Sequence, residues 1–235
     1  MDAWFQTVDG DAGSKGDITQ KFVPATEKVS SWLLAGNGAL FNSPATWLLK
    51  NYEKKLLSAP PYNYLAERFL AKAKAANNMG NQCNIPSGNL VGLNYLDAIG
   101  NCSGTARLNS APNGDPSVFF IEGDLNITGD VVLKPGDSTI FIVSRDILVE
   151  SSVNRIDGIY IAGRTFDDVG SGSPTVNVTF EVNGSVLAGN VSLDRVLNAG
   201  NSTTPAEKFI FQPKYLVLLN SLLGSAAISW KEVNP

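Results

Sequence analysis

A short segment recurs along the second half of this chain, and the repeat restricts the fold more than any other feature. Each copy holds an aliphatic residue, a small or polar pair, a polar residue and usually another aliphatic residue. The copies are Ile121–Leu125, Val143–Ile147, Ile161–Thr165 and Val182–Val186. A second apolar stretch follows in three of them: Val131–Leu133, Val153–Ile156 and Val191–Leu193.

Repeats of about 20 residues that carry short strands indicate successive coils of a parallel β-helix, or solenoid. One coil cannot bury its inward aliphatic side chains alone, so neighbouring coils stack about 4.8 Å apart and share a core. We therefore predict a mainly β protein, a parallel β-helix (solenoid) with an inserted or capping α-helical segment. A β-sandwich is the alternative, because the strand spacing fits it too.

The repeat also predicts which side chains point inward. In its register one column contains Ile121, Val143, Ile161 and Val182, and a second contains Val131, Val153 and Val191.

The chain divides into three sections by composition. Residues 1–42 are glycine-rich with short apolar runs, which predicts N-terminal strands that join the solenoid. Residues 43–110 have helical spacing and form the predicted insertion or cap. Residues 111–235 supply the solenoid coils and C-terminal capping strands.

Three helices are predicted in the middle section. The first begins at Ser43–Pro44, a capping residue followed by proline at the first helical position, and ends before Pro60–Pro61. The second runs from Tyr62 and places Leu65, Phe69, Ala73 and Ala76 on one face. A short third helix is predicted from Leu90 to Ile99.

The two cysteines, Cys83 and Cys102, enclose a segment rich in asparagine and glycine. We predict that they form a disulfide bond if the protein is exported, worth about 3 kcal/mol through loop closure. Two free thiols would be expected in a reducing compartment.

The chain contains no histidine, and this excludes many kinds of site. Serine–histidine and cysteine–histidine nucleophiles and every histidine-ligated metal centre are ruled out. A net charge of −4 and scattered basic residues argue against nucleic-acid binding. We predict no catalytic residues, no cofactor and no metal site, so the chain is not expected to be an enzyme.

One group of charged residues nevertheless falls in register. Asp124, Asp146 and Arg164 occupy the same position of successive copies. Stacked carboxylates of this kind occur in carbohydrate-cleaving β-helices and in calcium sites. The prediction made here is a solvated charge column in which arginine offsets the two carboxylates.

Several short motifs resemble a known group of proteins. They are Trp4–Gln6 with Gly10–Asp11, Thr204–Phe209, Pro213–Tyr215 and Trp230–Pro235. These motifs resemble the C-terminal regions of large surface proteins of small-genome candidate-phylum bacteria. The Gly-Asp-Leu coils are similar to these and, more loosely, to pilus-associated and ice-binding β-helices. The resemblance implies an exported β-helical domain of a longer polypeptide and carries over no catalytic residue.

These observations predict a structural or adhesive module, secreted or exposed at the cell surface. Its expected partners are an unknown surface ligand or neighbouring domains of a longer chain, and not nucleic acid. The start of the chain lacks the basic and apolar regions of a signal peptide, as expected for one domain of a larger protein. The stretch from Tyr215 to Ile228 is too short and too interrupted to span a bilayer. A glycan- or calcium-binding module is the alternative function, and a carbohydrate-active β-helix enzyme is less favoured.

Overall fold

The computed structural model describes residues 5–9, 12–14, 17–20, 33–35, 38–41, 48–50, 61–88, 90–113, 115–215 and 217. For the described residues among 12–50, and for residue 61, it describes the backbone alone. The early elements are β1 (Phe5–Val8), β2 (Ala12–Ser14), β3 (Asp17–Gln20), β4 (Leu33–Ala35), β5 (Gly38–Phe41), β6 (Leu48–Lys50) and α1 (Pro61–Ala76). The middle elements are β7 (Gly92–Asp97), α2 (Ala98–Asn101), β8 (Thr105–Leu108), β9 (Ser117–Glu122), β10 (Asp124–Ile127), β11 (Thr139–Val143) and β12 (Ile147–Val149). The last are β13 (Arg155–Asp167), β14 (Thr175–Val176), β15 (Phe180–Ser192), β16 (Val196–Leu197) and β17 (Glu207–Ile210).

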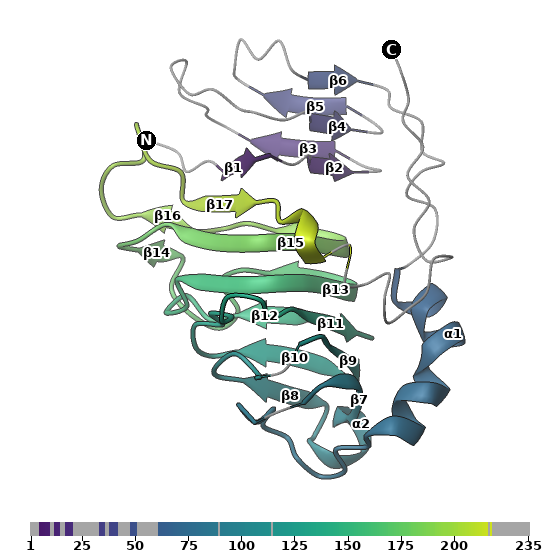
Figure 1. Ribbon diagram of the computed structural model, residues 1–235. Coiled ribbons are helices and arrows are strands. Elements are labelled where there is room, and N and C mark those ends of the chain that lie inside the picture. Colours follow the sequence, from purple (N-terminus) through teal and green to yellow (C-terminus); the bar gives the residue numbers. More distant parts are fainter. Residues whose placement is uncertain are drawn as a thin grey trace.

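Parallel strand pairing organises the molecule (Figure 1). A 10-stranded sheet contains the path β1-β17-β15-β13-β11-β9-β7, with β10, β12 and β8 paired beside it. Smaller sheets join β14 to β16, β3 to β5, and β2 to β4 and β6. The prediction of a mainly β protein is confirmed, with a large parallel sheet and few helices. The antiparallel pairing of a β-sandwich does not occur among the described strands.

Two ladders of strands face a shared interior. The first is β7–β9–β11–β13, and the second is β8–β10–β12 followed by the end of β13. Strand β13 belongs to both, because Ile159–Ala162 pair with β11 and Phe166–Asp167 pair with β12; between these parts its pairing with β15 shifts register. Residues of both ladders meet in one buried cluster that includes Phe119, Leu125 and Ile147.

Aromatic rings continue this interior from strand to strand. The rings of Phe119 and Phe141 stack with centroids 5.1 Å apart, and those of Phe141 and Tyr160 with centroids 5.3 Å apart. These residues occupy matching positions of β9, β11 and β13. Parallel in-register pairing therefore aligns the rings and adds stacking to the burial of apolar area.

Helix α1 covers the opposite face of the first ladder (Figure 1). Its buried residues Tyr62, Leu65, Phe69 and Ala73 recur at helical spacing, as the sequence predicts, whereas Ala76 is exposed. They join a second cluster with outward-facing residues of the sheet, among them Phe120 and Ile142. Both faces of β9 and β11 are therefore buried, which explains their nearly unbroken apolar sequences.

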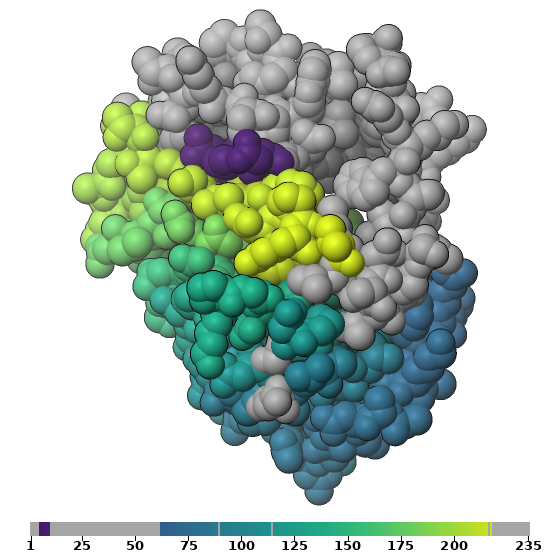
Figure 2. Space-filling model, viewed as in Figure 1, coloured from purple at the N-terminus to yellow at the C-terminus, as the bar shows by residue number. Residues whose placement is uncertain are grey.

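The strand pair β1–β17 joins distant parts of the sequence. Residues Phe5–Val8 pair in parallel with Glu207–Ile210, which pair in turn with β15. Figure 2 shows β1 in purple lying directly against the yellow C-terminal residues. The rings of Phe5 and Phe209 meet edge to face with centroids 6.5 Å apart. We refer to this pair of strands as the seam.

Glycine is required where the backbones of β13 and β15 approach each other most closely. Gly184 lies beside Gly158 in the β13–β15 pair, and both have positive φ angles. A Cβ atom on Gly184 would overlap the Gly158 carbonyl oxygen. The glycine at this position of the repeat thus permits a backbone approach that no other residue could make.

Two of the predicted helices are wrong. Residues Leu48–Lys50, within the first of them, form β6, which pairs with β4; the rest of that helix lies outside the described residues. Gly92–Asp97, within the third, form β7, and only the single turn Ala98–Asn101 is helical. Parallel partners decide both segments, because tertiary pairing outweighs the helical spacing of a few apolar residues.

The predicted inward columns are correct only in part. Ile121 and Val143 are neighbours, but the next strand places Ala162 beside Val143, so Ile161 lies on the helix-covered face. Val182 pairs with Ile156 instead. In the second column Val131 and Val153 are buried, whereas Val191 is 44% exposed. The predicted C-terminal capping strands after residue 217 lie outside the described residues.

Candidate functional site

The residues of the predicted charge column lie together on the outer surface of the second ladder. Asp124 begins β10, Asp146 precedes β12, and Arg164 lies at the register shift in β13. One guanidinium nitrogen of Arg164, Nη2, lies 2.7 Å from Asp146 Oδ2 and 3.3 Å from Asp124 Oδ1. One exposed arginine therefore bridges two carboxylates on neighbouring strands.

Each carboxylate of this column also accepts a backbone hydrogen bond from the next strand. The amide of Asp146 donates to Asp124 Oδ1 over 3.1 Å. The amide of Thr165 donates to Asp146 Oδ1 over 3.0 Å. Each aspartate thus joins the backbone of the next strand region to the guanidinium of Arg164.

A second charged group lies where β13, β15 and β17 run side by side. Arg155, Glu181 and Lys208 occupy paired positions of these strands. The Arg155 side chain forms two hydrogen bonds to Asp157, and this contact raises the pKa of the guanidinium. Lys208 Nζ lies 3.9 Å from Glu181 Oε1. Exposed charges alternate in sign across adjacent strands here as well, an arrangement worth about 0–1 kcal/mol per pair.

Arg195 is a fully buried charged side chain, with 1% of its surface exposed. Its Nε donates to the Asp168 carbonyl over 2.8 Å, and its two terminal nitrogens donate to the carbonyls of Val153 and Glu150 over 2.6 Å and 3.0 Å. The guanidinium carbon lies 4.2 Å from the centroid of the Phe180 ring. One side chain thus holds three backbone carbonyls from the loops that precede β13 and follow it.

Two buried carboxyl groups accompany this arginine. Asp168 Oδ1 accepts a hydrogen bond from the Asp194 amide over 2.9 Å, and Glu207 Oε1 accepts one from the Arg195 amide over 2.9 Å. Burial, with the nearby charge of Asp168, raises the pKa of Glu207 to about 9. Burial raises the pKa of Asp168 as well, against the opposing effects of the Asp194 amide and Arg195. We call Asp168, Arg195 and Glu207 the buried trio.

The sequence does not predict the buried trio. Adjacent aspartates such as Asp167–Asp168 are expected at an exposed loop tip, but Asp168 is fully buried. Its partners come from the loop before β16 and from β17, so no local pattern marks the burial. In the sequence Arg195 follows Asp194 and Glu207 precedes Lys208, so each looks like half of an ordinary exposed charge pair.

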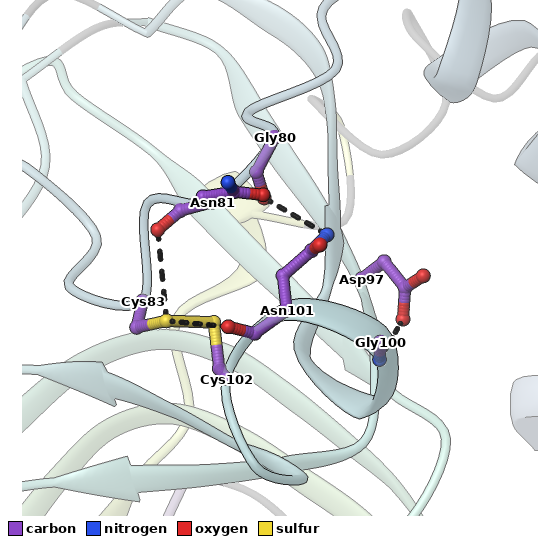
Figure 3. The surroundings of a disulfide bond; sticks show 7 residues. All are labelled: Gly80, Asn81, Cys83, Asp97, Gly100, Asn101 and Cys102. Atoms are coloured by element: carbon purple, nitrogen blue, oxygen red, sulfur yellow. Dashed lines mark hydrogen bonds between the residues drawn. A yellow bond between two sulfur atoms is a disulfide. The ribbon is translucent and has the colours of Figure 1, made fainter.

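The disulfide closes the lower end of the sheet. Cys83 and Cys102 are joined with their Cα atoms 5.3 Å apart. Figure 3 shows the Asn101 side chain donating to the Gly80 carbonyl beside the bond, over 3.3 Å. The segment that carries Cys83 makes isolated parallel bridges from Asn78 to β7 and from Asn84 to β8. The bond therefore fastens the outermost segment to the sheet and covers an edge that would otherwise be open.

No protein-family model, no curated protein and no solved structure matches this chain. Within the described residues, no group of three or more cysteine, aspartate and glutamate side chains could hold a metal ion. No described helix is both long enough and apolar enough to cross a membrane. The function is therefore inferred from the geometry of the residues themselves.

Proposed function

We propose that the chain is a non-enzymatic β-solenoid module of a larger exported protein, with a structural or adhesive role at the cell surface. In this proposal the two ladders are sides of successive coils, and the buried cluster between them is the shared core. The parallel pairing and the continuous columns of apolar side chains support it.

The main support for the proposal is that the recurring charged residues bind one another and the backbone of neighbouring strands. Arg164 bridges Asp124 and Asp146, and each aspartate also accepts an amide of the adjoining strand. Their hydrogen-bonding capacity is directed at neighbouring strands. Such contacts hold a stack of strands in register, which is what a rigid surface module needs.

Replacing both Asp124 and Asp146 with asparagine distinguishes a scaffold from a catalytic or calcium site. We expect the double variant to fold and to lose no more than about 1–2 kcal/mol, because the ion pairs are partly exposed and asparagine still accepts the amide hydrogen bonds. Thermal melts with and without calcium, and assays for glycan cleavage, make the comparison. The matched control replaces both residues with alanine and should destabilise more, because the amides of Asp146 and Thr165 then lose their acceptors. Glycan cleavage or calcium-dependent stabilisation in the parent, lost in the asparagine variant, would overturn the proposal.

The location is tested in cells that make the protein. A membrane-impermeant biotin reagent applied to intact cells should label the chain, because we propose that it lies outside the membrane. Cys83 and Cys102 should then be recovered as a disulfide when free thiols are alkylated at lysis, since exported domains persist in oxidising surroundings. A known cytoplasmic protein serves as the unlabelled control. Recovery of an unlabelled chain with two alkylated thiols would contradict the surface location.

A further inference from the structure

The buried trio contains one more acidic group than basic group. Asp168, Arg195 and Glu207 expose 0%, 1% and 2% of their surfaces. If both carboxyl groups were ionised, the trio would bury a net negative charge, which is costly in a protein interior. One retained proton makes the trio neutral.

The hydrogen bonds of the trio leave a place for that proton between the two carboxyl groups. Asp168 Oδ2 is 3.4 Å from Arg195 Nε, but the hydrogen of that nitrogen is donated to the Asp168 carbonyl. With Glu207 ionised, this buried oxygen has no hydrogen-bond donor. The Asp168 and Glu207 side chains lie within hydrogen-bonding reach of each other, and two carboxylates can share such a bond only when one is protonated.

We propose that Asp168 and Glu207 share a single proton beside Arg195, and that this proton latches the seam to the rest of the sheet. Glu207 is the residue of β17 that pairs with Phe5 of β1 on one side and with Phe180 of β15 on the other. Its side chain is thus the buried anchor of the strand through which β1 is attached.

The other charged groups around the trio do not replace this proton. Asp194 contributes its amide, Glu150 contributes its carbonyl, and Asp167 and Asp130 add negative charge to the surroundings of Asp168 and Arg195. The neighbours of Glu207 along the pair of strands, Lys208 and Glu181, form an ion pair with each other. No second buried cation therefore faces Glu207 from the described elements.

The direction of the pH effect follows from the raised pKa of Glu207, which is about 9 in the folded protein. When the seam opens, Glu207 returns to its ordinary pKa of 4.5 and releases its proton at any pH above that value. The latch therefore stabilises the closed seam fully in acid, and this stabilisation is lost as pH rises toward 9. Opening of the seam should increase about tenfold per pH unit between pH 6 and 9 and level off above that range.

Hydrogen–deuterium exchange of peptides that cover β1 and β17 tests this expectation. Labelling times are shortened in proportion to the hydroxide concentration, so that intrinsic exchange is equal at every pH. In the parent chain, protection of β17 should fall with the stated slope, while peptides from β9 and β11 stay protected. In Glu207→Gln, whose amide donates without a titratable proton, protection of β17 should not change between pH 6 and 9.

The latch is refuted if the parent shows no slope, if Glu207→Gln keeps the slope, or if β9 and β11 lose protection together with β17. If Glu207→Gln fails to fold, the same exchange experiment on Asp168→Asn tests the latch. This variant leaves one carboxyl group beside one guanidinium, so Glu207 should ionise at lower pH. The fall in the protection of β17 between pH 6 and 9 should then disappear. An unchanged alkaline slope in Asp168→Asn would overturn the proposal.

Discussion

Replacing Arg195 with methionine should destabilise the chain by about 3–5 kcal/mol, because it removes one partner from a buried set of charges. The carbonyls of Glu150, Val153 and Asp168 would each lose a hydrogen-bond donor, and Asp168 and Glu207 would lose their counter-charge. For a domain of this size the expected fall in melting temperature is about 6–20 °C. Calorimetry or circular dichroism at neutral pH measures it.

Arg164→Met is the matched control for this experiment. It removes the same guanidinium from a site where the side chain is 56% exposed and the ion pairs reach water. We expect a loss of no more than about 1 kcal/mol. Equal effects of the two substitutions would show that Arg195 is not the buried connector described above.

Val153→Asp should prevent stable folding, because the new carboxylate would lie in the apolar cluster without a partner. Val153 is fully buried, and its carbonyl accepts the 2.6 Å hydrogen bond from Arg195. An unpaired buried charge combined with lost packing costs more than about 4 kcal/mol, a large part of the stability of an ordinary domain. Denaturant unfolding, or recovery of the variant only in insoluble form, reports the effect.

Val191→Asp is the control for Val153→Asp, because the repeat predicts that both side chains point inward and the structure buries only Val153. Val191 shares the inward column of Val153 in the repeat but is 44% exposed in the structure. Val191→Asp should therefore change stability by less than about 1 kcal/mol. A severe effect at Val191, or a mild one at Val153, would contradict the burial described for these two side chains.

The strands were predictable because aliphatic residues recur with a nearly constant spacing. Ile121 and Val143 are indeed neighbours, and α1 follows its apolar spacing from Leu65 to Ala73. The register fails at β13, where Ala162 and not Ile161 continues the column. This strand runs through two ladders without a break, and no spacing of short segments reveals its length or its register shift.

The charge column could be predicted from the repeat, whereas the buried trio could not. Asp124 and Asp146 hold the same place in neighbouring copies of the repeat, so the repeat itself places them close together. Asp168 and Arg195 lie in loops, where charged residues are usually solvated. Their burial depends on contacts between the loop after β13, the loop before β16 and β17, and only the three-dimensional structure shows these contacts.

The pairing of β1 with β17 also limits the order in which the chain can fold. During synthesis β1 emerges early, yet the strand beside it is completed only when Ile210 has been made. Contacts that join such distant residues give a high contact order, which slows folding. The edge of the sheet at β1 and β17 therefore cannot pair until almost all of the other described strands have been synthesised.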